Sequence, residues 1–516
     1  MLKLMSFVCR QAWGIRIVAA VLALQIVMLP LSASASASSA SEVVPVGLPD
    51  SMVRMLESQR ISVQNVSLWV SDAQGNPRIA HNVDVPRNPA SLIKLHTAWT
   101  ALETLGPGYR WETGVYTFAP IVGDVLQGDL YIRGGGDPWL VSEEVWKLTG
   151  ALRRQGIREI QGDLVFDLSL FDLEPEDPGA FDGQRFRAYN QPPHALLMNF
   201  NALRFEFRPD ADGRSVRVTT DPPNSVVQVD NQLRLQPRSC SGFQRGVNFQ
   251  VVDEERVRLD GSFPSTCREY GLLRTAVSPE AFAYGLFREM WQQWGGSLNG
   301  QWRLGALPPE VLASLRQDRR SDSETSDAQE AYEPLVLHRS PMLAELLGGV
   351  NKRSNNVMTR QMKLAIGLEK YGPPATVEKG NQTLREFFAE RLPGHGEIML
   401  DNAAGLSRTN RITARQLAGV LSSAQSSLYA PEFLSSLALS GVDGTLRERF
   451  VEHPAAGRMR LKTGYLRDVS GVAGYVNAAS GSAYTVVLMI NYPGIDHSRG
   501  VDIQDAILEA IYEERF

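Results

Sequence analysis

Aliphatic and polar positions alternate early in the chain and then take up a helical spacing. Within residues 66–70, aliphatic side chains occupy every second position, which predicts a half-buried strand. Within residues 91–105, large apolar side chains recur every three or four positions, and Gly106 follows them. This spacing predicts an amphipathic helix that ends at the glycine.

The pattern changes in the middle of the chain. From residue 109 to about residue 277, short β-type runs alternate with frequent turns. Helical spacing interrupts them at residues 142–156 and resumes at 279–295. Residues 317–333 are polar, charged and rich in Ser and Asp, which is typical of a surface loop. The middle of the chain is therefore expected to be mostly β.

The last third returns to a mixed pattern. It is helical from residue 341 to about 448 and then has β runs at 459–466, 472–477 and 483–491. A final helix is expected after Asp502. The whole pattern predicts an α/β unit that is split by a long, mostly β insertion.

Composition narrows the class of protein. The chain has 516 residues, of which 43% are hydrophobic and 21% charged, so two or three packed domains are expected. Its formal charge is −5, from 52 basic and 57 acidic residues, and no basic stripe is present, which argues against a nucleic-acid partner. The histidines lack metal-ligand spacing, and Gly134-Gly-Gly-Asp137 lacks the pattern of a nucleotide loop. We therefore expect neither a metal nor a cofactor.

The N-terminus has the organisation of a secretory signal. Three basic residues flank or precede an apolar run at 17–31, and the Ser/Ala-rich stretch 32–41 follows. Cleavage after Ala37 would remove residues 1–37 as a signal peptide, and we expect export to the periplasm. The alternative is a membrane anchor, but the run is short for a span of about 20 residues. A loose membrane association and the oligomeric state stay open.

Two of the three cysteines remain after such cleavage, because Cys9 leaves with the signal. Cys240 and Cys267 form an even pair in an oxidising compartment, which predicts a disulfide. Two separate buried thiols are the alternative.

Ser91 and Lys94 are three positions apart at the start of the predicted helix, so they share one face. A serine hydroxyl is a weak nucleophile, and a lysine with a lowered pKa can activate it. By itself the pair also fits a helix N-cap followed by an exposed lysine.

Two further motifs favour the catalytic interpretation. Ser354-Asn355-Asn356 follows a predicted helix, and Lys462-Thr463-Gly464 lies in a predicted strand. The order Ser-x-x-Lys, Ser-x-Asn, Lys-Thr-Gly is the set found in serine penicillin-binding enzymes. The first motif supplies a nucleophile and its base, and the second supplies a proton relay and an amide. The third supplies a cation and a hydroxyl that can bind a carboxylate.

The chain resembles the D-alanyl-D-alanine carboxypeptidase/D-alanyl-D-alanine-endopeptidase family, the class C low-molecular-mass penicillin-binding proteins. Four further stretches carry the resemblance in the family's order: 89–94, 128–138, 401–413 and 440–447. The resemblance implies an α/β penicillin-binding (serine β-lactamase-like) domain, with a five-stranded sheet and two nested, mostly β inserted domains.

The resemblance also implies where the domains begin and end. The catalytic domain would comprise 42–107 and 334–516, inserted domain II 108–150 and 276–333, and inserted domain III 151–275.

The resemblance also implies roles for the motif residues. Ser91 would attack the D-Ala-D-Ala carbonyl, with Lys94 as the base, and Ser354 would pass a proton to the leaving amine. Asn356 would orient the substrate amide. The remaining roles are carboxylate binding by Lys462 and Thr463, close substrate approach at Gly464, and an oxyanion hole from the backbone N–H groups of Ser91 and Tyr465. The expected partners are peptidoglycan stem peptides that end in, or are cross-linked through, D-Ala, and β-lactam antibiotics.

Some positions depart from the family pattern. Tyr465 stands where Thr or Ser usually follows Lys-Thr-Gly, which moves or removes a hydroxyl for the substrate carboxylate and would favour cross-linked peptides. Asn355 occupies a position that is usually Asp, and little effect is expected from this change. Ala404 replaces a common Ser. Asp182 could meet the amino end of a diaminopimelate side chain, but a solvated loop aspartate fits its surroundings better.

Two other functions compete with a peptidase. A β-lactamase would need fast deacylation, and the 263 residues between Ser91 and Ser354 argue against it. A catalytically silent peptidoglycan-binding or scaffolding protein would keep the fold, but all three motifs are intact. The balance between carboxypeptidase and endopeptidase action is open at this stage.

Overall fold

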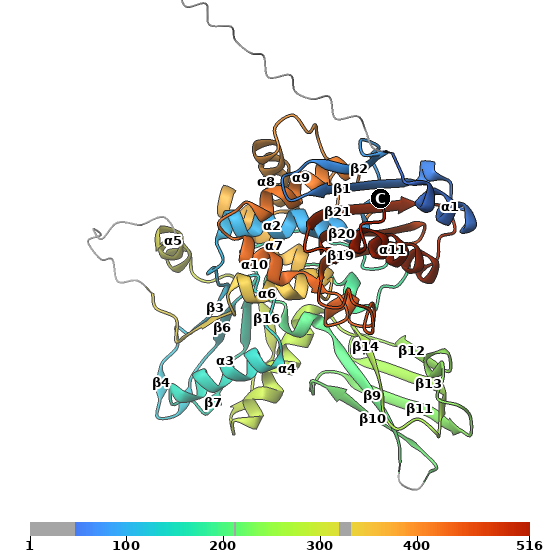
Figure 1. Cartoon of the computed structure of the whole chain (residues 1–516). Helices are drawn as coiled ribbons and strands as arrows, with labels where there is room; N and C mark the ends of the chain where they lie inside the picture. The colour runs from blue at the N-terminus through green and yellow to red at the C-terminus, as the bar shows by residue number, and fades with distance from the viewer. Residues whose placement is uncertain (1–46, 211–212, 319–331) are drawn as a thin grey trace, which may run out of the picture. The chain divides into compact units, whose positions relative to one another are not determined.

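The computed structural model describes residues 47–210, 213–318 and 332–516 (Figure 1). The predicted signal peptide, residues 1–37, lies outside these ranges, as does most of the predicted loop at 317–333. Within the described ranges, no helix combines the length and the apolar character that crossing a membrane requires.

A six-stranded sheet forms the centre of the α/β unit. Its order is β18-β19-β20-β21-β1-β2. The strands are β18 (Ala438–Leu439), β19 (Met459–Leu466), β20 (Val469–Asn477), β21 (Ala483–Asn491), β1 (Val66–Asp72) and β2 (Pro77–His81). The resemblance implied five strands, and that number is wrong here, because the two-residue β18 adds to the edge of β19.

Each face of this sheet is covered by helices, so the strands are apolar on both sides (Figure 1). Ala473 and Val487 pack in one core, whereas their neighbours Val472 and Leu488 pack in the other. The first core contains α2 (Lys94–Leu105), α6 (Leu343–Asn351), α7 (Asn356–Tyr371), α8 (Val377–Arg391), α9 (Ala414–Gln425) and α10 (Ala430–Ser436). The second contains α1 (Asp50–Ser58) and α11 (His497–Tyr512).

Two predicted helix starts differ from the structure. The helix predicted from Ser91 begins as the 3₁₀ turn η2 (Ala90–Ile93) and becomes α-helical only at Lys94. The C-terminal helix begins at His497 and not after Asp502, because the Asp496 side chain accepts from the Arg499 N–H and caps it.

The insertion is mostly β, as the sequence predicts, and four sheets are formed wholly or largely by it. Two have the orders β16-β8-β6-β3-β17 and β15-β7-β5-β4, and the others are β10-β9-β14 and β11-β13-β12. The first two comprise β3 (Glu112–Tyr116), β4 (Ile121–Val122), β5 (Val125–Leu126), β6 (Leu130–Arg133), β7 (Glu159–Ile160), β8 (Leu164–Asp167), β15 (Ser297–Leu298), β16 (Trp302–Leu304) and β17 (Val336–Arg339). The others comprise β9 (Leu203–Pro209), β10 (Val216–Asp221), β11 (Gln228–Gln236), β12 (Val247–Val251), β13 (Arg256–Pro264) and β14 (Tyr270–Arg274).

Three α-helices accompany these sheets: α3 (Ser142–Arg154), α4 (Pro279–Gln293) and α5 (Pro309–Asp318). The inner boundary expected at residue 151 falls before β7 and β8, and these strands pair with β5 and β6. The division into three domains stays a prediction, and the strand pairing favours an inner boundary after β8.

The predicted disulfide is confirmed. Cys240 and Cys267 are bonded and lie 27 residues apart, so the alternative of two separate thiols is wrong. The bond joins the segment after β11 to the segment after β13.

Candidate active site

Ser91 lies on the 3₁₀ turn η2, one turn before Lys94 at the start of α2. Ala90, directly before the serine, has the left-handed backbone angle φ 46°, which is uncommon for a residue other than glycine. The Lys94 side chain is completely buried, and its Nζ lies 2.9 Å from Ser91 Oγ. An N-cap followed by an exposed lysine is therefore the wrong interpretation of this motif.

Lys94 Nζ also contacts two carbonyl oxygens. It donates to Asn356 Oδ1 at 2.7 Å and to the backbone oxygen of Ala404. A neutral lysine has two N–H groups and one lone pair. Because both carbonyls can only accept, the lone pair of neutral Lys94 is left facing the Ser91 hydroxyl, which then donates to it.

The protonation of Lys94 is set by burial and by a second cation. Burial, followed by the charge of Lys462, holds the pKa of Lys94 well below its ordinary value. A base with a lowered pKa is what a serine nucleophile needs at neutral pH.

Lys462 is the second completely buried lysine and lies on β19. Its Nζ donates to Ser354 Oγ at 2.9 Å and to the backbone oxygen of Thr463 at 2.7 Å. Burial lowers the pKa of Lys462 to about 7. Ser354 has a left-handed backbone with φ 55°, a conformation of the kind that persists at functional sites when the surrounding structure holds it.

The first residue of α7 connects this group to the insertion. Asn356 accepts from Lys94 through Oδ1 and donates through Nδ2 to the Tyr189 backbone oxygen at 3.3 Å. Asn355 has a different task, since its side chain accepts from the Met358 N–H and caps α7. The second motif thus places Ser354 and Asn356 on the site.

The Lys-Thr-Gly segment lies at the edge of the sheet, where part of β19 is left unpaired. Strand β18 pairs only with Arg460 and Leu461 of β19. Among the described strands, none pairs with β19 on this side beyond Leu461, so Lys462–Tyr465 has a free edge. An edge of this kind can accept an extended peptide as an added strand.

A glycine is needed at position 464 for close packing, in addition to the close approach of substrate that the resemblance implies. A Cβ built there would lie 2.9 Å from the Pro89 backbone oxygen and 3.2 Å from the Leu92 backbone nitrogen. The missing side chain therefore lets β19 lie against the turn that carries Ser91.

Tyr465 points outward, with 44% of its surface exposed. Its ring meets the His497 ring edge to face at a centroid distance of 4.9 Å. Thr463 Oγ1 donates to Thr445 Oγ1 at 2.9 Å.

These groups line one cavity of about 460 Å³. Its wall includes five of the predicted residues, and the buried Lys94, Asn356 and Lys462 bond directly to the site's serines or to each other. The five are Ser91, Ser354, Thr463, Gly464 and Tyr465.

Asp182 lies on an exposed loop next to this site. Its carboxylate accepts from the Tyr189 hydroxyl at 2.8 Å, from Asn190 Nδ2 at 2.8 Å and from the Gln184 N–H at 2.9 Å. Burial raises its pKa, but these three hydrogen bonds outweigh that effect and leave the pKa below its ordinary value.

The structure adds three groups to those predicted from the sequence. They are the carbonyls of Ala404 and Tyr189, which accept from Lys94 and Asn356, and the Thr445 hydroxyl. Ala404 and Thr445 lie within stretches that match the family, but a backbone carbonyl has no residue-type signal that could mark it.

A separate group of possible metal ligands also occurs among the described residues. His453, Glu509 and Glu513 bring ligand atoms within 4.8 Å of one another. Arg515 already pairs with both carboxylates, at 3.2 Å and 2.5 Å, and none of the three lines the cavity at Ser91.

A serine beside a buried lysine, on an α/β unit with a free sheet edge, defines a serine acyl-transfer enzyme of the penicillin-binding class. The model of the D-Ala-D-Ala carboxypeptidase 3 (S13) family matches residues 49–513, and the chain belongs to this family.

Similar proteins agree with this assignment. The chain is 30% identical over 418 residues to the D-alanyl-D-alanine carboxypeptidase of an Actinomadura species, covering 77% of this chain and 72% of that one. It is 24% identical to the D-alanyl-D-alanine carboxypeptidase DacB of Haemophilus influenzae, covering 78% and 80%.

The fold is shared with a solved structure. Penicillin-binding protein 4 (dacB) of Haemophilus influenzae superimposes with a TM-score of 0.70 at 23% identity, over 87% of this chain and 96% of that chain. The expected penicillin-binding fold is thereby confirmed.

Proposed function

We propose that this protein is a serine-type D-Ala-D-Ala carboxypeptidase and endopeptidase that acts on peptidoglycan peptides through an acyl-enzyme on Ser91. The observation that carries the mechanism is the geometry of Lys94. Its two N–H groups are directed to carbonyls, so its neutral form can only accept a proton from Ser91.

Acylation transfers one proton in two stages. Ser91 Oγ attacks the carbonyl carbon of the penultimate D-Ala while its proton moves to Lys94 Nζ. The backbone N–H groups of Ser91 and Tyr465 stabilise the tetrahedral oxyanion, and losing such a donor typically costs about 10²–10³ in rate. That proton then passes from Lys94 to the Ser354 hydroxyl, which accepts a hydrogen bond from Lys462, as Ser354 gives its own proton to the leaving amine and the peptide bond breaks. Lys94 is then neutral again and Ser354 is again a hydroxyl.

Water completes the reaction. Water attacks the ester carbonyl, and its oxygen becomes part of the carboxylic acid that leaves. The other proton of the water goes to the Ser91 oxygen and restores the hydroxyl. The leaving amine is free D-Ala in carboxypeptidase action and the cross-linked D-amino acid in endopeptidase action. A β-lactam has the same reactive amide in a ring, so opening it leaves an ester on Ser91.

Substrate binding uses the free edge of β19. Asn356 orients the acyl-side amide, and Lys462 with Thr463 holds the terminal carboxylate. Lys462 Nζ donates to the backbone oxygen of Thr463, a residue of the cavity wall, so the positive charge of the ammonium group lies next to the cavity. Tyr465 offers only its backbone to the carboxylate, and its exposed ring favours cross-linked over free D-Ala-D-Ala ends.

We also propose that the protein acts in the periplasm after removal of residues 1–37. The basic, apolar and Ser/Ala-rich segments of the N-terminus support this, together with the disulfide.

The test is hydrolysis of two substrates by the mature protein and by Ser91→Ala. A D-Ala-D-Ala peptide should release D-Ala, and a cross-linked muropeptide dimer should be cut to monomers, by wild type alone. Absence of both activities in a folded protein would favour a silent scaffolding role. Rapid turnover of nitrocefin would favour a β-lactamase.

A further inference from the structure

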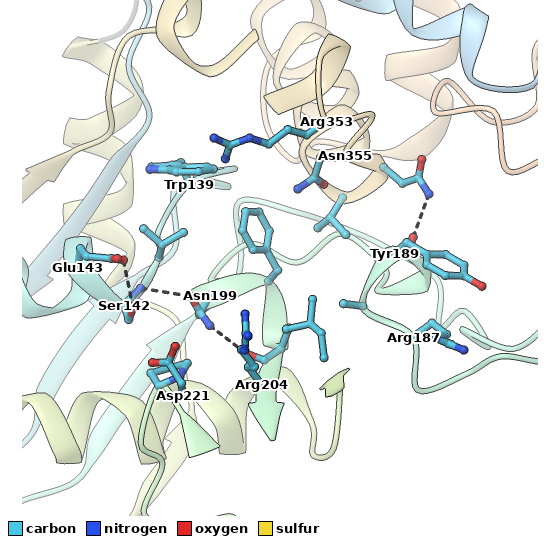
Figure 2. A pocket seen from close by; sticks show the side chains of 18 of the residues that line it. Trp139, Ser142, Glu143, Arg187, Tyr189, Asn199, Arg204, Asp221, Arg353 and Asn355 are labelled. Carbon is cyan, nitrogen blue, oxygen red and sulfur yellow. Dashed lines mark hydrogen bonds between the residues drawn. The ribbon is translucent and has the colours of Figure 1, made fainter. Parts of the chain in front are cut away.

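A second cavity, of about 660 Å³, adjoins the site just described. The two cavities share Ser354, and Asn356 also lines the second one. Figure 2 shows side chains around it, with Arg353 and Asn355 from the segment leading into α7 and Arg187 and Tyr189 from the loop around the 3₁₀ turn η3 (Ala188–Asn190). This volume is in the range of sites that hold a small ligand or a few residues of a peptide.

One wall of the cavity is built from strained backbone. Asn199, Phe200 and Asn201 are all left-handed, with φ values of 47°, 57° and 52°. Each such residue costs about 1 kcal/mol or more, and this cost concentrates at functional sites. The run presents the Phe200 ring to Trp139, edge to face at 5.9 Å, and both rings line the cavity.

Hydrogen bonds hold this wall in place. Asn199 Nδ2 donates to the Ala202 backbone oxygen at 2.8 Å, and its Oδ1 accepts from the Ser142 N–H at 3.3 Å. Asn201 Nδ2 donates to the Val277 backbone oxygen at 3.0 Å. The wall is thus rigid before any ligand arrives, which lowers the entropy lost on binding.

Cations outnumber carboxylates in the lining. The three arginines are Arg187, Arg204 and Arg353, and the two carboxylates are Glu143 and Asp221. Arg204 already pairs with a glutamate at 3.3 Å. Within the described parts of the chain, Arg353 is exposed and forms no ion pair.

Arg187 has both an anion and a cation near it. Burial raises the pKa of Asp182, and the charge of Arg187 is one of the interactions that lower it. Burial, followed by the charge of Arg187, lowers the pKa of Arg274 to about 10. Arg274 is not among the residues that line the cavity, so of these two arginines only Arg187 is available to a ligand bound in it. Arg353 and Arg187 line the cavity from different segments, and each guanidinium can bind a carboxylate with two parallel hydrogen bonds.

We propose that this cavity binds a carboxylate-bearing peptide segment of a cross-linked substrate, with Arg353 and Arg187 as carboxylate ligands and Trp139 and Phe200 as the apolar wall. The inference rests on the proposed function, because it assigns a second stretch of the same polymer to a site beside the nucleophile. A short D-Ala-D-Ala peptide would fill only the cavity at Ser91, whereas a cross-linked dimer would occupy both.

The test separates binding in this cavity from catalysis. In a Ser91→Ala background, which cannot be acylated, calorimetry measures the Kd of a cross-linked muropeptide dimer and of the same dimer with its free carboxyl groups amidated. Combining Arg353→Gln with Arg187→Gln should weaken binding of the free-acid dimer about tenfold and leave binding of the amidated dimer within twofold. Arg54→Gln, an exposed arginine on α1, is the matched control and should change neither value.

Kinetics in the active protein give the second readout. The double variant should raise KM for the dimer about tenfold at unchanged kcat, while its rate of acylation by benzylpenicillin stays within twofold of wild type. Equal Kd values for the variant and its parent would overturn the proposal. So would an equal loss with the amidated dimer, or a parallel fall in penicillin acylation, which would indicate a structural role. Failure of the proposed function itself would appear separately, as wild-type protein that benzylpenicillin does not acylate.

Discussion

Replacing Asn356 with aspartate tests whether Lys94 acts as a neutral base. The change keeps the shape of the side chain but puts a negative charge where Oδ1 now lies, 2.7 Å from Lys94 Nζ. An anion at this distance favours the protonated lysine, so the pKa of Lys94 should rise. Because only neutral Lys94 can accept the Ser91 proton, acylation should then require a higher pH.

The magnitude follows from the distance. Two unit charges 2.7 Å apart at an effective dielectric constant of 20 attract by about 6 kcal/mol. One pKa unit corresponds to about 1.4 kcal/mol, so the upper limit of the shift is about four units. Water entry and relaxation reduce this figure, and a shift of about two to three units is expected. At any pH at which Lys94 is mostly protonated in both proteins, the acylation rate should fall by about 10²–10³.

The assay is the second-order rate constant of benzylpenicillin acylation, followed by mass spectrometry between pH 5 and 10. In wild type the rate rises with pH as Lys94 loses its proton, and in Asn356→Asp this rise should move to higher pH. Asn356→Ala is the control, since it loses the same hydrogen bond without adding charge. It should lower the rate without a comparable alkaline displacement of the profile. A profile of Asn356→Asp that is merely scaled down, with its rise at the wild-type pH, would refute the base role of Lys94.

Four further predictions concern other parts of the molecule. The Cys240→Ala/Cys267→Ala variant should lose about 3.5 kcal/mol of unfolding free energy, the chain-entropy value for a 27-residue loop, and an unchanged urea midpoint would contradict this. Tyr465→Thr should increase kcat/KM for a free D-Ala-D-Ala peptide about tenfold relative to a cross-linked dimer, and an unchanged ratio would exclude a selective role. Because the pKa of Lys462 is about 7, KM for a carboxylate-terminated peptide should rise as pH increases above 7, whereas a flat KM would argue against carboxylate binding by this group. Gln361→Leu removes hydrogen bonds from a buried side chain on α7 to the backbone of His194 and Gly136, so unfolding free energy should fall by about 2–3 kcal/mol, and a loss below 0.5 kcal/mol would contradict that role.

The side chains at the centre of the site could be predicted because each motif contains a residue type that the chemistry demands. Ser91, Lys94 and Lys462 are of this kind, and their order along the chain distinguishes the set from a chance match. The carbonyls of Ala404 and Tyr189 could not be predicted, since any residue supplies a carbonyl and only the fold brings these two to Lys94 and Asn356.

The same limit applies to the fold. The strands β19, β20 and β21 were recognisable because each is eight or nine residues long and has a β-type pattern. By contrast, β18, β7 and β15 are two residues each and exist only through pairing with distant strands. Such pairing leaves no local periodicity, which is why the strand count of the main sheet differs from expectation. The start of α11 was misplaced for a local reason, the cap at Asp496.

If Ser91 is a nucleophile activated within a penicillin-binding site, it must form a covalent ester with a β-lactam. Intact-mass spectrometry of the mature protein after brief exposure to benzylpenicillin detects this ester, with Ser91→Ala treated in parallel. We expect one penicilloyl adduct per molecule of wild type, located on the peptide that contains Ser91, and none on the variant. A folded wild-type protein that gains no adduct, or an adduct that persists in Ser91→Ala, would contradict it.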